Sequence, residues 1–298
     1  MKIRIGSRGS ALALWQARHV GERLSALGHE TAIQVITTTG DRVQDRRLEV
    51  VGGKGAFLKE IEEAMLAGEV DLAVHSLKDV PTALPPGLRL CAVLERADPR
   101  DALLSSTGLA LKRLPAGARV GTTSLRRRAQ VAALRPDLVL QDLRGNVDTR
   151  IRRLREGVCE AIVLAVAGLE RLGRRSEAAE ILEPDVFVPA PGQGAIALEC
   201  REGDGPVAAA VAPLDHPPSA GAVAAERALL AGLEGGCNVP LGAYAVGEDG
   251  AWRLTAFVAR ADGSGLLRGQ VRDADPRRAG AALAEQLLAR GARELMRG

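Results

Sequence analysis

Apolar residues follow two patterns along the first two thirds of the chain. Short apolar runs predict strands, and apolar residues spaced three or four positions apart predict amphipathic helices. The strand-like runs cover 2–6, 31–38, 71–76 and 88–95, and the helix-like segments cover 11–27 and 57–68. Ser10 stands where a helix N-cap belongs, and Gly68 stands where a helix ends. Strands separated by helices indicate βαβ units and a largely parallel sheet.

A second block of the chain repeats this alternation. Strands are predicted at 119–124 and 138–143, helices at 125–135 and 147–157, and a strand that leads into a helix at 161–172. The stretches near residues 100 and 190 are rich in turn-forming residues, and we expect hinges there. Two such blocks predict a protein of two lobes with a cleft between them.

The pattern changes after about residue 217. A helix at 219–233 and a glycine-rich loop precede strand-like segments at 243–248, 252–260 and 266–273, and one long helix is predicted at 276–296. Short turns separate these strands, which favours an antiparallel sheet. The chain therefore combines α/β lobes with a smaller α+β C-terminal domain, and it shows no convincing internal sequence repeat.

Charge and composition exclude several classes of protein. The 298 residues include 40 basic and 37 acidic side chains, for a net charge of +3, and only 2% are aromatic. Nucleic-acid-binding proteins usually have a larger basic excess or stacking aromatic residues. No apolar run near the N-terminus is long enough for a signal peptide or a membrane span. We therefore expect a cytoplasmic protein that binds neither nucleic acids nor membranes, and no metal, because the histidines and cysteines lack ligand spacing.

Arginines gather at three predicted helix starts. The three groups are Arg8 with Ser10, Ser124 with Arg126–Arg128, and Arg144 with Arg150. The strand-to-helix loops of an α/β domain meet at one edge of the sheet, where helix N-termini and guanidinium groups bind anions. One such group alone is most often a solvated basic face. Three groups at equivalent positions predict a site for a ligand with several negative charges.

Two further features have side chains that suit catalysis or covalent attachment. Lys78 and Asp79 directly follow the predicted strand at 71–76, and a carboxylate beside an ammonium group can exchange protons at a fixed place. Cys237 lies in the glycine-rich loop LEGGCNVP, where a ligand can reach a thiol. Taken alone, a surface Lys–Asp pair and a structural cysteine are the commoner interpretations, so both features stay open at this point.

Nine stretches of the chain, in order, resemble the porphobilinogen deaminase family. They include GSRGSALALWQA, DLAVHSLKDVPT, GTTSLRRRAQ, LRGNVDTR, PAPGQGAIALEC and LEGGCNVPLGAYA. The resemblance runs from Ile5 to about Tyr244 and is weak beyond it. Because several of these motifs are long and all keep their order, chance agreement is excluded.

The resemblance implies a fold and a reaction. The fold would have two lobes with mixed sheets flanked by helices, similar to periplasmic binding proteins, and a third α+β domain. The lobes would be 1–94 with 195–212, and 100–188, and the third domain 217–298. The enzyme would be a monomeric transferase that joins four porphobilinogen molecules head to tail into hydroxymethylbilane and releases ammonia. Its primer would be a dipyrromethane cofactor that a thioether attaches to Cys237.

The resemblance also implies roles for individual residues. Asp79 matches the catalytic carboxylate that protonates the leaving amine and stabilises the positively charged pyrrole intermediates. The residues implied to bind the cofactor, besides Cys237, are Ser76, Lys78, Asp79, Thr122, Ser124, Arg126, Arg127, Arg144 and Arg150. Those implied to bind the substrate are Arg8, Ser10, Arg144, Arg150 and Gln193. Lys54 and Phe57 match a mobile segment near the site. Each pyrrole carries two carboxylates, so the growing chain is the polyanion that the arginine groups predict.

Three positions depart from the family pattern. Gly9 replaces a longer polar residue, and Ala11 stands where proline is common. Asp148 adds a carboxylate between Arg144 and Arg150, where we expect it to pair with Arg152 or to cap the helix. None of these departures removes a residue implied to act in the reaction.

Two alternatives follow from the same features. A two-lobed polyanion-binding protein without catalysis would need no cysteine in the loop and would usually have an export signal. A nucleic-acid-binding protein that uses the arginine-rich helix would usually be more basic. The resemblance favours the enzyme over both.

Overall fold

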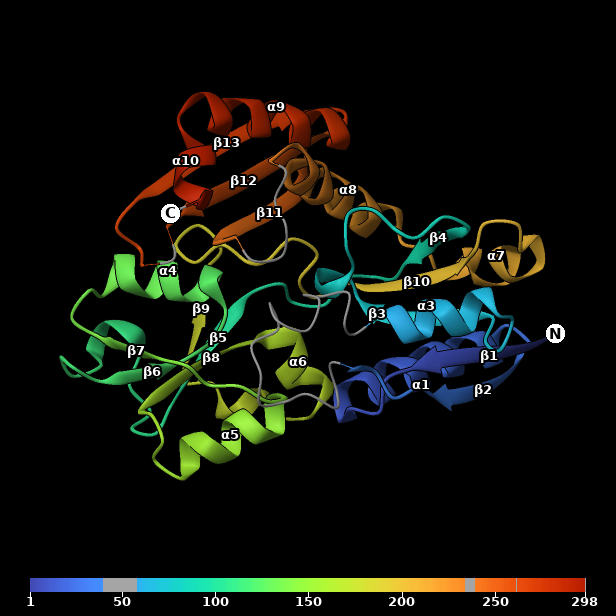
Figure 1. The fold of residues 1–298 in the computed structure, drawn as a ribbon, viewed down its shortest axis with the longest axis horizontal. Coiled ribbons are helices and arrows are strands. Elements are labelled where there is room, and N and C mark those ends of the chain that lie inside the picture. Colours follow the sequence, from blue (N-terminus) through green and yellow to red (C-terminus); the bar gives the residue numbers. More distant parts are fainter. Residues whose placement is uncertain (40–57, 234–238, 261, 298) are drawn as a thin grey trace. The chain divides into compact units, whose positions relative to one another are not determined.

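The computed structural model describes residues 1–39, 58–233, 239–260 and 262–297 (Figure 1). The chain divides into two compact units, Met1–Ala97 with Gly194–Ala220 and Asp98–Gln193 with Gly221–Gly298. It passes between the units three times: inside the turn-rich stretches near residues 100 and 190, and again between Ala220 and Gly221. The hinges, the cleft and the three domain boundaries stay predictions.

The first unit is built on a five-stranded sheet with the order β2-β1-β3-β10-β4. Its strands are β1 (Lys2–Ser7), β2 (Glu30–Val35), β3 (Leu72–Ser76), β4 (Leu88–Val93) and β10 (Ile196–Arg201). β1 pairs in parallel with β2 and β3, whereas β10 is antiparallel to β3 and β4. The expectation of a largely parallel sheet is therefore wrong, because β10 enters from a distant part of the chain.

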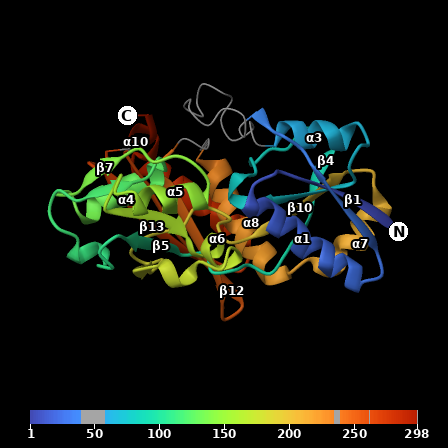
Figure 2. The ribbon, with the colours of Figure 1, turned by 90° about the horizontal axis from the view of Figure 1, so that it is seen from below.

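Helices cover both faces of this sheet, as Figure 2 shows. α1 (Ala11–Ala26) and α7 (Gly205–Val211) pack on one face, where Leu24 and Val211 are fully buried with Ile5 and Leu198. α3 (Lys59–Leu66) packs on the other face through Met65. The apolar stripe of each helix thus meets the apolar side chains of the strands.

The second unit contains a five-stranded sheet with the order β7-β6-β8-β5-β9. Its strands are β5 (Asp101–Ser105), β6 (Arg119–Gly121), β7 (Val139–Gln141), β8 (Ala161–Ala165) and β9 (Glu180–Leu182). β6 is parallel to β7 and β8, and β5 is antiparallel to β8 and β9. α4 (Leu125–Leu134) packs on one face, and α5 (Val147–Arg155) with α6 (Val166–Arg171) on the other.

The second unit also contains a three-stranded antiparallel sheet, in the order β11-β12-β13. Its strands are β11 (Leu241–Glu248), β12 (Ala251–Ala259) and β13 (Leu266–Asp273), and its helices are α8 (Pro217–Gly232), α9 (Pro276–Ala289) and α10 (Ala292–Arg297). The single helix predicted at 276–296 is wrong, since Gly291 takes a positive φ of 91° and separates α9 from α10. Short 3₁₀ turns lie at Leu77–Asp79, Leu111–Arg113, Arg175–Glu177 and Ala212–Leu214.

Two mixed sheets flanked by helices and a smaller antiparallel sheet with helices confirm the predicted fold class. The predicted N-cap is confirmed as well, because the Ser10 hydroxyl accepts a hydrogen bond from the Ala13 N–H at 3.3 Å. Among the described helices, none is long and apolar enough to cross a membrane.

Candidate functional site

The first unit carries its predicted site residues at the carboxyl ends of β1 and β3. β1 leads through Arg8 to Ser10, and β3 ends at Ser76 and runs directly into the 3₁₀ turn with Lys78 and Asp79. Since β1 and β3 are parallel neighbours, both ends reach the same edge of the sheet. The topology thus brings these five residues to one edge.

Both serines in this group make hydrogen bonds within the protein. Ser10 caps α1, and the Ser76 hydroxyl accepts a hydrogen bond from the Gln16 side-chain amide at 2.8 Å. Gln16 is buried in α1, so the bond ties the end of β3 to that helix. Ser10 therefore stabilises the start of α1, and Ser76 stabilises the contact between this helix and the strand that leads to Asp79.

Asp79 itself is half-buried. Leu77, at the start of the turn, is buried and its N–H donates to the Ala195 carbonyl at 3.0 Å, which fixes the turn to the segment before β10. The turn thus presents one carboxylate and one ammonium group at the edge of the sheet.

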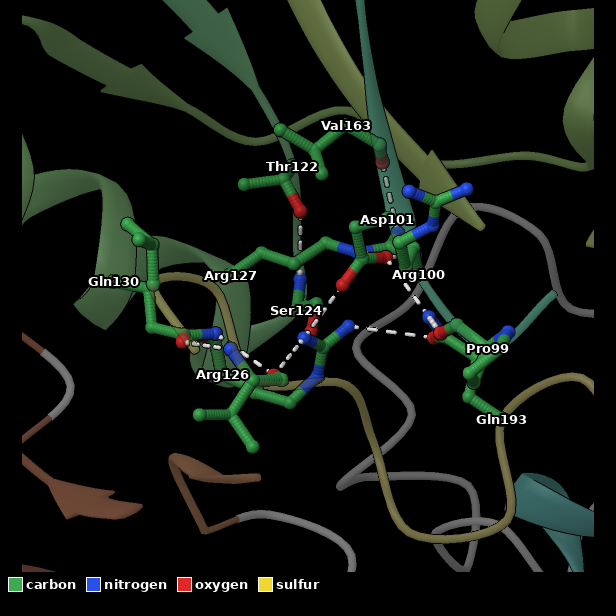
Figure 3. Close-up of polar contacts among 12 residues, drawn as sticks. Pro99, Arg100, Asp101, Thr122, Ser124, Arg126, Arg127, Gln130, Val163 and Gln193 are labelled. Carbon is green, nitrogen blue, oxygen red and sulfur yellow. Dashed lines mark hydrogen bonds and ion pairs between the residues drawn. The ribbon is translucent and has the colours of Figure 1, made fainter. Parts of the chain in front are cut away.

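The second unit holds a buried cluster of charged side chains, drawn in Figure 3. Arg126 and Arg127, in the first turn of α4, both point to Asp101 at the start of β5. Arg126 donates to one Asp101 oxygen at 2.7 Å, and Arg127 donates to the other through Nη2 at 2.8 Å and Nε at 3.1 Å. Asp101 is 0% exposed, and the two arginines are 5% and 6% exposed. Neither arginine is the solvated basic residue that a run of arginines usually indicates.

Backbone carbonyls hold both guanidinium groups from a second side. Arg126 donates to the Val188 carbonyl at 2.7 Å, and Arg127 donates to the Val163 carbonyl in β8 at 2.8 Å. The ring of Phe187 lies 5.9 Å from the Arg126 guanidinium carbon. These contacts allow each guanidinium group little freedom to turn.

Gln193 belongs to the same cluster. Its side-chain N–H₂ donates to the Pro99 carbonyl at 2.7 Å and to Asp101 at 3.2 Å, and its oxygen accepts from Arg126 at 3.4 Å (Figure 3). The structure therefore brings together Arg126, Arg127 and Gln193, which the sequence predicts as site residues. Asp101 completes the group, and sequence reasoning missed it.

The cluster has an excess of positive charge, since two buried guanidinium groups share one buried carboxylate. Burial lowers the pKa of Arg126; the Asp101 carboxylate opposes this shift, and the nearby Arg127 cation adds to it. A buried charge without a counterion is unfavourable, so an anionic group is the ligand that this cluster suits.

Thr122, Ser124, Arg144 and Arg150 lie at the starts of α4 and α5. Thr122 is buried and accepts a hydrogen bond from the Ser124 N–H at 3.2 Å, whereas the Ser124 side chain makes no capping bond to α4. Arg150 donates to the Gly145 carbonyl at 2.8 Å, and Arg144 is half-buried. These residues share one place in the fold, because α4 follows the carboxyl end of β6 and α5 follows that of its parallel neighbour β7.

The turn before α5 requires glycine. Gly145 has a φ of 111°, and a Cβ atom there would lie 2.6 Å from the Thr149 side chain. Asn146 caps α5 by accepting from the Thr149 N–H at 2.9 Å. Asp148 neither caps this helix nor pairs with Arg152, as the sequence suggests; it pairs with Arg174 at 3.1 Å. That partner lies beyond α6 and cannot be read from the spacing.

Cys237, Lys54 and Phe57 lie outside the described residues. Of the other cysteines, Cys159 and Cys200 are buried and Cys91 is half-buried in β4, where its thiol donates to the Leu198 carbonyl. In the described part of the chain, no three histidine, cysteine, aspartate or glutamate side chains come together as a metal site would require.

Comparison with known proteins identifies two matching family descriptions. Residues 3–209 match "Porphobilinogen deaminase, dipyromethane cofactor binding domain", and residues 220–289 match "Porphobilinogen deaminase, C-terminal domain". The likeness thus extends well beyond Tyr244, where the motifs in the sequence become weak.

Curated relatives match along the whole chain. The porphobilinogen deaminase of Roseiflexus castenholzii is 52% identical over 300 residues, which cover 99% of this chain and 99% of the relative. That of Thiobacillus denitrificans is 49% identical over 298 residues, which cover 99% and 97%.

Among solved structures, the chain is similar to a periplasmic substrate-binding protein of an ABC transporter from Coxiella burnetii. The TM-score is 0.45 at 15% identity, and the match covers 76% of this chain and 96% of that one. A YaeC-family lipoprotein from Enterococcus faecalis matches with a TM-score of 0.40 at 13% identity, over 68% and 85% of the two chains.

The family descriptions cover both units, and each relative matches along nearly its whole length with about half of the aligned residues identical. The chain therefore belongs to the porphobilinogen deaminase family.

Proposed function

We propose that this chain joins four porphobilinogen molecules head to tail into hydroxymethylbilane, with loss of ammonia, on a dipyrromethane primer attached to Cys237. The observation that carries the proposal is the match of residues 3–209 to the family's dipyrromethane-cofactor-binding domain. The two-lobed binding protein without catalysis loses its support, because the full-length relatives are enzymes by name.

The residues present fit this cofactor. A dipyrromethane carries the acetate and propionate groups of two pyrroles, and the cluster around Asp101 has a positive charge in excess. Carboxylates pair with guanidinium groups at helix starts, where the helix dipole adds to the attraction. When bound, the primer supplies the pyrrole carbon to which the first substrate is joined.

We assign the residues of each unit to separate tasks. Arg126 and Arg127 bind carboxylates from within the buried cluster. Thr122, Ser124, Arg144 and Arg150 bind the remaining carboxylates and polar atoms from the starts of α4 and α5. Arg8, Ser10, Ser76 and Lys78 bind from the edge of the first sheet, and Gln193 binds substrate while it holds Arg126 in place.

Asp79 is the catalytic residue in this proposal. Loss of ammonia from porphobilinogen needs a proton on the leaving amine and leaves a positive charge on the substrate. A fixed carboxyl group can donate the proton in its acid form, and the carboxylate that this leaves can then stabilise that charge. Asp79 suits this task because the buried turn at Leu77 holds it while its carboxylate stays half-exposed.

We also propose that the enzyme is a cytoplasmic monomer. Among its four cysteines, no pair has the short spacing of a metal or disulfide motif, which suits a reducing compartment. Light scattering of the purified protein tests the monomer directly.

Intact-protein mass spectrometry tests the covalent primer. The purified active chain should be heavier than its sequence mass by one dipyrromethane, and a peptide containing Cys237 should carry that mass. Cys237→Ser should show the unmodified mass and no turnover. The matched control Cys91→Ser should keep both the adduct and the activity. An unmodified mass in fully active protein would overturn the proposal, as would an adduct that persists in Cys237→Ser.

A further inference from the structure

Asp101 is a carboxylate of the second unit that accepts hydrogen bonds from three different side chains. It is fully buried, it forms ion pairs with Arg126 and Arg127, and it accepts a further hydrogen bond from Gln193. Its position follows from the fold, because β5 begins at Asp101 and pairs there with Ala165, the last residue of β8. The carboxylate therefore lies at the edge of the sheet where α4 begins, rather than within the sheet.

We infer that Asp101 is a positioning residue for the reaction: it fixes the directions in which Arg126 and Arg127 present their guanidinium groups to a ligand carboxylate. This inference rests on the proposed function, in which the two arginines bind carboxylates of the primer. Asp101 itself needs no contact with the primer or the substrate.

The contacts of the cluster support this role. One Asp101 oxygen accepts a hydrogen bond from Nη1 of Arg126, and the other accepts hydrogen bonds from Nε and Nη2 of Arg127. The carbonyl of Val188 accepts a further hydrogen bond from Arg126, and the carbonyl of Val163 accepts one from Arg127. Each guanidinium plane is thus held from two sides, which leaves its remaining N–H groups pointing in set directions. Binding groups that are held before the ligand arrives lose less entropy on binding.

The charges support it as well. Without Asp101, two buried guanidinium groups would face each other with no anion between them, and like charges in a buried site repel strongly. With Asp101 present, the cluster keeps one positive charge for the ligand. The carboxylate therefore lets both arginines stay buried and charged at the same place.

Three substitutions at Asp101 separate positioning from packing, with Asp142→Asn as the matched control. Asp142 also pairs with an arginine of α4, Arg128 at 3.0 Å, but its side chain is 62% exposed. Asp101→Glu keeps the charge and moves the carboxylate by one methylene. Asp101→Asn removes the charge and keeps the size. Asp101→Ala keeps the Cβ atom, removes the carboxylate and leaves room for formate as a probe.

The readouts are turnover, the fraction of chains that carry the adduct by intact mass, and the melting temperature. Asp101→Glu should melt close to wild type, yet lose about 100-fold in turnover, because displaced binding groups lower the rate by that order. Asp101→Asn should carry the adduct in a smaller fraction of chains. In Asp101→Ala, formate should raise both turnover and melting temperature, while in wild type and Asp142→Asn formate should change neither quantity.

Wild-type turnover with a full adduct in Asp101→Glu would overturn the inference. A folded Asp101→Ala whose lost turnover formate does not restore would overturn it too, since it would show a packing role only. If Asp101→Ala does not fold, Asp101→Glu decides the question alone. Failure of the proposed function looks different, because the active wild-type chain would then carry no adduct.

Discussion

The two five-stranded sheets have the same topology but different residues at corresponding positions. In each, the three strands at one end form two consecutive parallel pairs, and one inserted strand is antiparallel to both of its neighbours: β10 in the first sheet and β5 in the second. Each inserted strand is the first strand after the chain passes from one unit to the other. The sequence shows no internal repeat, so the shared architecture depends on where apolar residues recur and not on which residues recur.

At the amino ends of the central strands the two sheets also share an ion pair. Asp71, just before β3, accepts hydrogen bonds from the backbone and side chain of Arg4 in β1. Glu160, just before β8, accepts the same bonds from Arg119 in β6. Arginine hydrogen bonds lower the pKa of both carboxyl groups to about 2. This end of each sheet serves stability.

At the carboxyl ends the sheets differ. β3 runs into the turn that carries Asp79, whereas β8 runs into α6 with apolar Val166. The inserted strand β5 begins with Asp101, which holds arginines, whereas the buried carboxylate of β10, Glu199, lies further along and pairs with His75 at 2.8 Å. The same scaffold thus carries different groups at its two sheet edges: one presents the carboxylate that we propose as catalytic, and the other presents arginines held by Asp101.

Removal of the Asp79 carboxylate should have the largest effect. Asp79→Asn should keep the fold and the adduct but lower kcat about 100- to 1000-fold, as expected when one charged group that stabilises the transition state is lost. Steady-state kinetics and intact mass measure the two parts. Glu69→Gln, at an exposed carboxylate of the same unit, is the control. Normal turnover in Asp79→Asn would contradict the proposal that the edge of the first sheet supplies the catalytic carboxylate.

The equivalent ion pairs should make both sheets sensitive to acid. A carboxyl group whose pKa is lower in the folded state stabilises the protein above its unfolded value and loses that effect as pH falls towards the folded value. The window therefore runs from the ordinary carboxyl pKa down to about 2 for Asp71 and Glu160. Urea denaturation between about pH 5 and about pH 2 should show a smaller loss of stability in Asp71→Asn than in wild type.

Glu160→Gln should reduce that acid sensitivity less than Asp71→Asn does. The Asp71 side chain is 13% exposed and also pairs with Arg201, whereas the Glu160 side chain is 36% exposed. Exposed ion pairs contribute little because water screens them. Equal effects of the two variants would show that Arg201, the second partner of Asp71, adds nothing to the stability of the first sheet.

The serines at the first helix of each sheet should have the smallest effects, and the two effects should differ. Ser10 caps α1 through its side chain, whereas Ser124 makes no such bond to α4. Ser10→Ala should therefore lower the free energy of unfolding by about 1 kcal/mol. Ser124→Ala should leave stability within about 0.5 kcal/mol and raise KM for porphobilinogen instead. A stability loss in Ser124→Ala equal to that in Ser10→Ala would contradict a ligand role for Ser124.

Local patterns in the sequence predict much of the scaffold. The helix beginning after Ser10, the strand at Leu72–Ser76 and the three C-terminal strands follow from apolar period and turn residues, which act over a few positions. β5 and β9 escape this reasoning because they take their neighbours from distant parts of the chain. The break at Gly291 escapes it because glycine is tolerated within apolar helical patterns.

The same limit applies to the site. Arg126, Arg127 and Gln193 are predicted, but their shared partner Asp101 lies 25 residues before Arg126 along the chain. In the sequence, Asp101 stands in a turn-rich stretch, DPRD, and nothing local separates it from Asp98. Only the pairing of β5 with β8 places it under α4. Long-range strand pairing is therefore what the local pattern cannot supply.

The inserted strand β10 has a consequence for biosynthesis. It lies between β3 and β4, so β4 has no neighbour in its sheet until residues 196–201 have left the ribosome. At about 5–20 residues per second, the first 97 residues wait on the order of ten seconds with an open sheet edge, a state that favours aggregation. The second sheet needs only the continuous stretch from Asp101 to Leu182. Of the two five-stranded sheets, the one whose translation begins first is thus completed second, and chaperones that shield nascent chains should act mainly on the first 97 residues.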